Sequence, residues 1–149
     1  MIFIKRVNSI NPGFRELIGL LDNDLNSRYS KDQEEYDKHN IIEFIETVVV
    51  AYSENTPVGC GCFKEYDNST IEIKRMFVVS EFRGKGISKQ ILKELESWGK
   101  QLGYSKSILE TGIKQHEAIG LYSNFGYSKI KNFGQYADMP NSVCFLKYL

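Results

Sequence analysis

The segment from Ile71 to Leu102 joins a strand pattern to a helix pattern through a short basic turn. Ile71 to Val79 reads IEIKRMFVV, which is rich in the β-branched and aromatic residues that favour strands. After the turn, apolar residues recur at helical spacing: Ile87, Ile91, Leu95, Trp98 and Leu102. The turn, Arg83 to Ser88, reads RGKGIS, so the helix begins inside it. This order predicts one strand–helix half of a crossover unit in an α/β sheet.

The turn has the composition of an anion-binding site. Gly84 and Gly86 allow close backbone approach and unusual dihedral angles. Successive main-chain N–H groups can then form a nest, and the helix N-terminus adds a partial positive charge. Arg83, Lys85 and Lys89 supply full charges. We therefore expect a phosphate or pyrophosphate ligand at the carboxyl end of the strand. The alternative is an ordinary strand–turn–helix connection with glycine at the bend.

Length and charge restrict the class of protein. The chain has 149 residues, which fits one domain spanning 1–149. Its formal net charge is zero, so a general electrostatic grip on nucleic acid is not expected. No apolar run approaches the roughly 20 residues that cross a bilayer, and the N-terminal MIFIKRVN lacks an apolar signal segment. These features predict a cytoplasmic protein that binds neither nucleic acid nor membrane.

The cysteines give no recognisable metal or disulfide pattern. Cys60 and Cys62 alternate onto one face of an expected strand, and Cys144 lies far away in the sequence. A zinc site would need a second cysteine pair or nearby histidine ligands. We therefore expect reduced thiols in the core and no metal.

Apolar and turn patterns place further elements on both sides of the central segment. Strands are expected at 2–7, 47–52, 58–66, 107–110, 127–131 and 143–148. Helices are expected at 14–25, within 26–40 and at 117–125. The order predicts an α/β fold with a mixed sheet of about six to seven mostly antiparallel strands. Helices should cover both faces, and the strands around the helix at 87–102 should form a central parallel pair.

Three segments give the chain a family resemblance: MFVVSEFRGKGIS, SILETG and AIGLYSNFGY. With them, residues 70–131 resemble the GNAT superfamily of acyl-CoA-dependent N-acetyltransferases, and the expected order of elements agrees. The loop pattern of that family is Arg or Gln, two residues, Gly, one residue, then Gly or Ala. It corresponds here to Arg83, Gly86 and Ser88. Serine departs from the family pattern, and its hydroxyl could cap the helix or touch the phosphate.

The resemblance implies that acetyl-CoA is the co-substrate and that the loop amides hold its pyrophosphate. The strand before the loop would bind the pantetheine arm through its main chain. Gln115 stands where family members often have an Asn that bonds the pantetheine. The cofactor-binding residues implied in this way are Phe77, Val78, Val79, Arg83, Gly84, Lys85, Gly86, Ile87, Ser88 and Gln115.

Acetyl transfer to an amine calls for a base. An alkyl ammonium has a pKa near ~10.4, so at pH 7 the neutral amine costs roughly 4.6 kcal/mol. A positioned carboxylate, or water, can take the proton. Glu72 is the first candidate: it lies six residues before Val78 on one strand, so the two side chains should share a face. Some GNAT members carry their base at the matching position. Glu110 is the competing base, and His116 a weaker one.

The departing thiolate calls for an acid. In GNAT members the Tyr of an L-Y-x-x-x-G-F/Y helix often protonates the CoA thiolate, and that residue here is Tyr122. A phenol with a pKa near ~10 can give a proton to a thiolate and can stabilise developing charge. The alternative is a core aromatic, because Tyr122 shares a helix stripe with Ile119 and Phe125.

The acceptor site is the least defined part. In GNAT folds the first two helices and the C-terminal hairpin line it, which would place Arg28, Tyr29, Tyr136 and the acidic run 32–37 near the substrate, with Glu110. The acidic run would suit a cationic amine, whereas Arg28 would suit a substrate carboxylate. A solvated helix face is the alternative for the acidic run.

These patterns together predict an N-acetyltransferase that moves an acetyl group from acetyl-CoA to a primary amine of a small molecule or peptide, by direct attack in a ternary complex. A non-catalytic acyl-CoA-binding protein and a protein-interaction module of the same fold are the alternatives. The sequence leaves the acceptor, the acyl length and a homodimer open.

Overall fold

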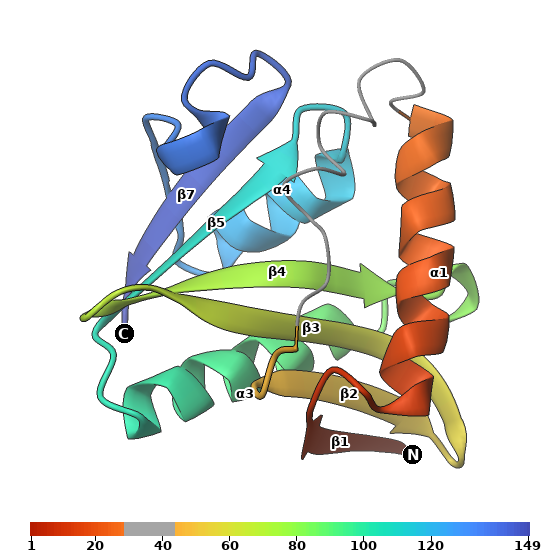
Figure 1. Ribbon diagram of the computed structural model, residues 1–149. Coiled ribbons are helices and arrows are strands. Elements are labelled where there is room, and N and C mark those ends of the chain that lie inside the picture. Colours follow the sequence, from red (N-terminus) through yellow and green to blue (C-terminus); the bar gives the residue numbers. More distant parts are fainter. Residues whose placement is uncertain (29–43) are drawn as a thin grey trace.

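A seven-stranded mixed sheet organises the part of the chain that the computed structural model describes, residues 1–28 and 44–149 (Figure 1). The elements are β1 (Ile2–Val7), α1 (Pro12–Arg28), β2 (Val48–Ser53), β3 (Thr56–Asp67), β4 (Thr70–Val78), η1 (Ser80–Phe82), α3 (Ile87–Gln101), β5 (Lys106–Gly112), α4 (His116–Asn124), β6 (Ser128–Ile130), η2 (Gly134–Tyr136) and β7 (Ser142–Tyr148). Their order across the sheet is β1-β2-β3-β4-β5-β7-β6. The predicted mixed sheet is confirmed, and β4 and β5 are its parallel pair. Beyond the end of α1, the helix expected within 26–40 lies outside the described residues.

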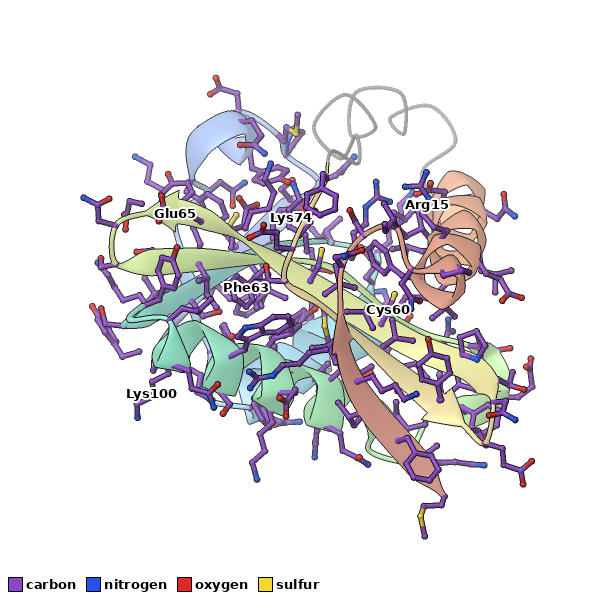
Figure 2. The ribbon with its side chains drawn as sticks, turned by 60° about the horizontal axis from the view of Figure 1, so that its bottom comes forward. Arg15, Cys60, Phe63, Glu65, Lys74 and Lys100 are labelled. Carbon is purple, nitrogen blue, oxygen red and sulfur yellow. The ribbon has the colours of Figure 1, made fainter. Side chains whose placement is uncertain are left out.

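Helices cover both faces of the sheet, as predicted. Val48 and Val50 of β2 pack with Phe14 of α1 in one core cluster. Val49 and Ala51, which alternate with them, pack on the other face in the cluster that holds the buried stripe of α3. Figure 2 shows Phe63 of β3 on the α3 side, where its ring meets Trp98 edge-on at 6.0 Å between centroids. Tyr122 of α4 belongs to this second cluster too.

Two glycines bring α3 close to the sheet. A Cβ on Gly59 would stand 2.9 Å from Cδ1 of Ile91, and one on Gly61 would stand 2.5 Å from the sulfur of Met76. Side chains at these positions of β3 would push the helix away. Their absence fixes the height of α3 above the strands, and with it the position of the loop that precedes the helix.

The parallel pair separates before either strand ends. β4 and β5 are paired only from Thr70 to Ile73 and from Lys106 to Leu109. β4 continues to Val78 and β5 to Gly112, and the two strands diverge in Figure 1. A gap in the middle of the sheet follows from this divergence, and the loop at the end of β4 lies beside it.

An extra residue in β4 accompanies the divergence. Cys60 of β3 pairs with Phe77, but Cys62 pairs with Lys74, so β4 is one residue longer than β3 in this stretch. Arg75 lies in the extra stretch with φ of 60°, the left-handed region that non-glycine residues rarely adopt. This is a β-bulge, which bends a strand and breaks the alternation of its side chains.

The bulge overturns one expectation about side-chain direction. Ile73, before the bulge, and Val78, after it, both belong to the core cluster on the α3 face. Glu72 alternates with Ile73 and therefore lies on the opposite face from Val78. The prediction that Glu72 and Val78 share a face is wrong, because strict alternation over six residues does not survive the inserted residue.

Candidate active site

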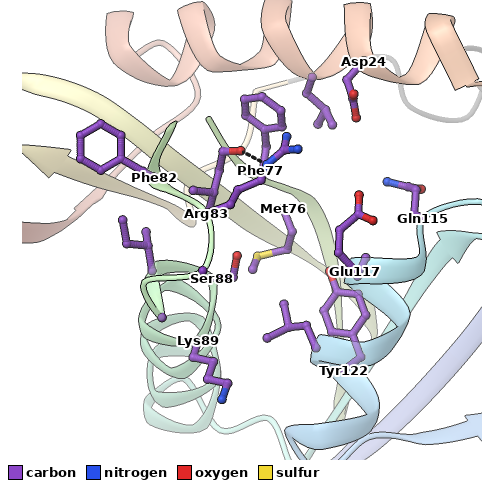
Figure 3. Close-up of a pocket in the computed structure, with 17 residues that line it drawn as sticks. Asp24, Met76, Phe77, Phe82, Arg83, Ser88, Lys89, Gln115, Glu117 and Tyr122 are labelled. Atoms are coloured by element: carbon purple, nitrogen blue, oxygen red, sulfur yellow. Dashed lines mark hydrogen bonds between the residues drawn. The ribbon is translucent and has the colours of Figure 1, made fainter. Parts of the chain in front are cut away.

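A pocket of about 390 Å³ lies where β4 and β5 diverge. Its walls come from the end of β4, the loop from Phe82 to Ser88, the start of α3, and α4, with Leu21 and Asp24 of α1 at one edge (Figure 3). The volume is in the range of ordinary ligand pockets. The basic loop lies at one end of the pocket and Tyr122 at the other.

The loop presents a set of main-chain donors. Gly84 and Gly86 have φ values of 78° and 80°, a conformation that glycine adopts without strain. Gly86 is the N-cap of α3, which has no side-chain cap. Within the described residues, no acceptor bonds the main-chain N–H groups from Gly84 to Lys89. These donors, together with the positive end of the helix dipole, are suited to bind an anion.

Arg83 holds the loop against the strand that precedes it, and Lys85 contacts Phe82 at the end of η1. The Nε of Arg83 donates a hydrogen bond of 2.8 Å to the carbonyl of Val78, shown as a dashed line in Figure 3. The Arg83 guanidinium also lies 5.6 Å from the centre of the Phe77 ring, and Lys85 lies 4.9 Å from that of Phe82. Arg83 therefore has a structural role in shaping the loop, besides the charge that it brings to the pocket.

The main chain at the end of β4 is only partly available to a ligand. The N–H of Val79 donates to the carbonyl of Val58 at 2.9 Å, and the carbonyl of Val79 accepts from Phe82 at 3.0 Å. Because strand residues direct their main-chain groups alternately to the two sides, Phe77 also faces β3, while Met76 and Val78 face the gap. Of the three residues expected to bind through the main chain, Val78 alone directs its main-chain groups to the gap, and its carbonyl already accepts the hydrogen bond from Arg83. Phe77 contributes its side chain to the pocket wall.

Gln115 is the N-cap residue of α4 and turns back toward β5. Its Oε1 accepts hydrogen bonds from the N–H of Gly112 at 2.9 Å and from the hydroxyl of Thr111 at 3.2 Å. These bonds fix the start of α4 on the end of β5. The Nε2 group, a donor, is the part of this amide left for a ligand in the pocket that Gln115 lines.

Tyr122 projects from α4 into the gap between the strands. The residue is 5% exposed, and its ring packs against Tyr127 and Phe145. Among the described residues, no group hydrogen-bonds its hydroxyl, yet no buried side-chain oxygen or nitrogen there lacks a partner. The hydroxyl must therefore reach the pocket surface. Burial, followed by the charge of Glu110, raises the pKa of Tyr122, so the group remains a phenol and a proton donor.

A second, smaller pocket of about 90 Å³ lies beyond Tyr122 and shares that residue with the first pocket. Glu72, Lys74, Glu110 and Tyr136 line it. Ile73 and Leu109 pack on the α3 face of the sheet. Successive strand residues point to opposite faces, so Glu72 and Lys74, on either side of Ile73, lie on the α1 face. Glu110, which follows Leu109, lies on that face for the same reason. The structure therefore brings three residues that the sequence singled out, Glu72, Glu110 and Tyr122, to one pocket.

The two carboxylates differ in their surroundings. Burial raises the pKa of Glu110 from 4.5 to about 7, although a hydrogen bond of 2.7 Å from the Ser142 hydroxyl and the charge of Lys74 act against the rise. Burial also raises the pKa of Glu72, against the charge of Lys74 at 3.9 Å. Glu110 influences the pKa of Tyr122, whereas Glu72 is not among the causes. Glu110 is thus the carboxylate electrostatically coupled to the phenol.

Sequence reasoning missed one residue that lines this pocket and one that orders the segment carrying Tyr136. It did not single out Lys74, whose place was readable from the alternation after Glu72. It did not find Asn132, whose side-chain amide donates to the carbonyls of Tyr136, Met139 and Ser142 and so orders the connection between β6 and β7. No local sequence signal marks an asparagine that bonds residues four to ten positions away.

Two expected substrate-binding residues cannot be placed against this pocket. Arg28 ends α1, but its side chain lies outside the described residues, as do Tyr29 and the acidic run 32–37. Within the described part of the chain, no group of three or more His, Cys, Asp or Glu residues could hold a metal ion. All three cysteines are buried thiols. No helix among the described residues is long and apolar enough to span a membrane.

Comparison with known proteins places this geometry among acetyltransferases. A model of the acetyltransferase (GNAT) family matches residues 14–127. The chain is 35% identical over 101 residues to the uncharacterised N-acetyltransferase YsnE of Bacillus subtilis, which covers 66% of this chain and 67% of YsnE. It is also 35% identical over 96 residues to an IAA acetyltransferase of Azospirillum brasilense, covering 64% of this chain and 63% of that protein. The matched segment thus spans less than two thirds of the Azospirillum relative.

Solved structures agree in fold. A Klebsiella pneumoniae protein provisionally named an acyl-CoA N-acyltransferase superimposes with a TM-score of 0.82 at 27% identity, covering 100% of this chain and 98% of that one. A GNAT-family acetyltransferase of Elizabethkingia anophelis, solved with acetyl-CoA bound, has a TM-score of 0.70 at 22% identity, covering 99% and 98%.

Proposed function

The chain belongs to the acetyltransferase (GNAT) family, and from this premise we propose that it transfers an acetyl group from acetyl-CoA to a primary amine of a small molecule or peptide. One observation carries the proposal. The N–H groups from Gly84 to Lys89, which have no acceptor among the described residues, lie at one end of a pocket whose other end holds the hydroxyl of Tyr122. The acetyl-CoA in the Elizabethkingia structure of the same fold supports this choice of donor.

In the proposed complex the loop amides take the pyrophosphate, and Arg83, Lys85 and Lys89 add positive charge around it. The pantetheine arm then runs along the gap side of β4, where Met76 and Val78 present their main-chain groups. The Nε2 of Gln115 donates to the arm from the opposite wall. This path brings the thioester to Tyr122 at the junction of the two pockets.

The amine enters from the smaller pocket and attacks the thioester carbonyl directly. The new C–N bond forms as the C–S bond breaks. An ammonium acceptor has two protons to lose, and the thiolate takes one, so one proton goes to solvent for each turnover. Holding amine and thioester in contact supplies a large part of the acceleration.

Glu110 is the base that the surroundings favour, and Tyr122 is the acid. A carboxylate with a pKa of about 7 is better matched to an ammonium than one at 4.5, because the proton-transfer gap is smaller. Tyr122, whose pKa is raised, gives a proton to the CoA thiolate and regains it from solvent or from the protonated base. Glu72 is then not the base, and its carboxylate balances the positive charge of Lys74, whose Nζ lies 3.9 Å away.

The test combines binding with turnover. Calorimetry should detect acetyl-CoA binding to the parent and equally to Tyr122→Phe, because the phenol lies at the far end from the loop. Thiol release over a panel of primary amines should fall roughly a hundredfold in Tyr122→Phe. The melting temperature should stay the same, because the hydroxyl has no partner among the described residues to lose.

The outcomes separate the alternatives. Absence of acetyl-CoA binding would remove the donor and the enzyme together, leaving an interaction module. Binding without release of thiol for any amine would indicate an acyl-CoA-binding protein instead. Equal turnover by the parent and Tyr122→Phe would remove Tyr122 as the acid while leaving the transferase.

A further inference from the structure

The smaller pocket carries charges of both signs on one face of the sheet. In the parallel register Glu72 stands opposite Ile108, so Lys74 and Glu110 are level with each other just where the strands part. Arg75, also in the lining, is ion-paired at 2.6 Å with Asp22 of α1. Two carboxylates and two cationic groups therefore border a single cavity. A purely cationic guest would not need the cationic side, and a purely anionic guest would not need the acidic side.

The ion pair inside the pocket is a loose one. The Nζ of Lys74 and the Oε2 of Glu72 are 3.9 Å apart, and both side chains are 11% exposed. A charge-assisted hydrogen bond between such groups is about 2.7–2.9 Å long. An ammonium has three N–H donors, so Lys74 can bond a further carboxylate in addition to its contacts within the chain.

Burial makes the charge of Lys74 costly. Desolvation lowers its pKa, against the favourable charge of Glu72. A carboxylate brought by a guest would lower that cost further, since an opposite charge favours the ionised form. A guest that brings an anionic group to Lys74 is therefore favoured over one that does not.

The volume of the smaller pocket and the position of the Tyr122 hydroxyl restrict the guest further. The cavity holds about 90 Å³, against about 390 Å³ for the larger pocket, which leaves room for a compact head group only. The hydroxyl of Tyr122, on a residue that is 5% exposed, opens at the junction with no partner among the described residues. The reacting nitrogen must lie at that junction, so the rest of a small guest extends toward Lys74.

We propose that the acceptor is a compact zwitterion of the α-amino acid type, with its amino group between Glu110 and Tyr122 and its carboxylate against Lys74. This inference rests on the proposed function and names the substrate class of the same site. Lys74 is then a specificity-determining residue: it selects amines that carry a carboxylate and leaves the transfer chemistry itself to other groups.

The experiment compares matched acceptors. Thiol release is measured with a panel of small L-amino acids, with the amines that lack only the carboxylate, and with the corresponding amino acid amides. Decarboxylation raises the basicity of the amine and amidation lowers it, so a loss of rate on both cannot come from basicity. The same panel is applied to Lys74→Met and to Lys64→Met. Lys64 faces Glu72 from β3 but does not line the pocket.

The parent should show kcat/KM values for at least one amino acid about tenfold to a hundredfold above those of its amine and its amide, the effect of one hydrogen bond to a charged group. Lys74→Met should lose that preference with an unchanged Kd for acetyl-CoA, while Lys64→Met should retain it. Equal or better use of the amines by the parent overturns the inference, and this arm needs no variant to fold. Turnover of no amino acid by a protein that binds acetyl-CoA also overturns it, whereas failure to bind acetyl-CoA refutes the proposed function instead.

Discussion

Glu110 and Glu72 are the same residue type on the same face of neighbouring strands, yet their positions give them different chemistry. Glu110 lies where the strands have begun to part, so buried groups surround it, and its carboxylate accepts a hydrogen bond from Ser142. Glu72 lies in the paired region with Lys74 beside it. Burial, followed by the charge of Glu72, raises the pKa of Glu110 to about 7 against the hydrogen bond from Ser142 and the attraction of Lys74. A carboxyl group whose pKa lies near neutrality follows from its place where the strands diverge.

The raised pKa of Glu110 predicts a pH profile. For a fixed neutral-amine concentration, kcat/KM in the parent should rise as pH passes through about 7, because the carboxylate must be ionised to accept a proton. Glu110→Gln should lower kcat/KM by roughly a hundredfold and abolish this rise. The titratable groups that share the pocket with Glu110 include Glu72, Lys74, Tyr122 and Tyr136. Glu72 is the other carboxylate among them, so Glu72→Gln is the control variant. A retained rise in Glu110→Gln would transfer the base role to Glu72 or to water.

The raised pKa of Glu110 also predicts how the free energy of unfolding depends on pH. The sign is opposite to that for a carboxylate whose pKa is lowered by folding. Below pH 4.5 the carboxyl is protonated in both states and costs nothing. As pH rises to about 7 the unfolded chain loses the proton first, so stability falls and then stays constant. Glu110→Gln should therefore raise the free energy of unfolding at pH 8 by at most about 3 kcal/mol, and little at pH 4.5.

Urea unfolding at the two pH values measures this difference. Glu46→Gln, at an exposed position next to β2, is the control and should change stability by less than about 0.5 kcal/mol at either pH. A Glu110→Gln variant that is less stable than the parent at pH 8 would mean that the ionised carboxylate is well satisfied in the folded chain, and the argument for its raised pKa would fail.

At the scale of elements, the loop between β4 and α3 depends on backbone conformation more than on side chains. Gly86 has φ of 80° with open space around its missing Cβ. Gly103, at the other end of the same helix, has φ of 99° and equally open space. Alanine at either position costs about 1–2 kcal/mol of backbone strain. The two substitutions should therefore cost similar stability. Gly86 lines the pocket, whereas Gly103 does not.

Gly86→Ala and Gly103→Ala should therefore have similar melting temperatures, below that of the parent. Only Gly86→Ala should weaken acetyl-CoA binding, by about tenfold or more, because its methyl group and altered φ disturb the donors that we propose bind the pyrophosphate. Calorimetry with each variant measures this. Equal weakening in both would show that general destabilisation, and not the loop, controls affinity.

The sequence predicted those elements whose signal is local. The strand pattern of IEIKRMFVV, the turn with Gly84 and Gly86 and the apolar period of α3 are each written in consecutive residues, and all three are confirmed. The bulge at Arg75 was not predictable in this way, because it depends on how β4 pairs with β3. Its consequence, the opposite faces of Glu72 and Val78, was missed for the same reason. The elevated pKa of Glu110 was likewise out of reach, since it arises from burial by residues of other strands and helices.

At the scale of the whole molecule, the larger pocket joins parts of the chain that are distant in sequence. Its lining includes residues from four elements that are far apart along the chain: Leu21 of α1, Met76 of β4, Ser88 of α3 and Tyr122 of α4. β4 and β5 are held together by pairing only from Thr70 to Ile73 on the β4 side. A ligand in this pocket therefore contacts α1, β4, α3 and α4 together and adds interactions that the unfolded chain cannot make.

Acetyl-CoA should consequently stabilise the whole fold. At a concentration of about 100 times Kd, mass action adds about 2.7 kcal/mol to the free energy of unfolding, which corresponds to roughly 5 to 10 °C in Tm for a domain of this size. S-acetyl-pantetheine at the same concentration has the arm and the thioester but no diphosphate, so it should shift Tm by less than about 2 °C. Gly86→Ala should lose most of the acetyl-CoA shift and Gly103→Ala should keep it. Scanning calorimetry decides the matter: equal shifts from the two ligands would mean that the arm alone binds the protein, and that the N–H groups from Gly84 to Lys89 hold no diphosphate.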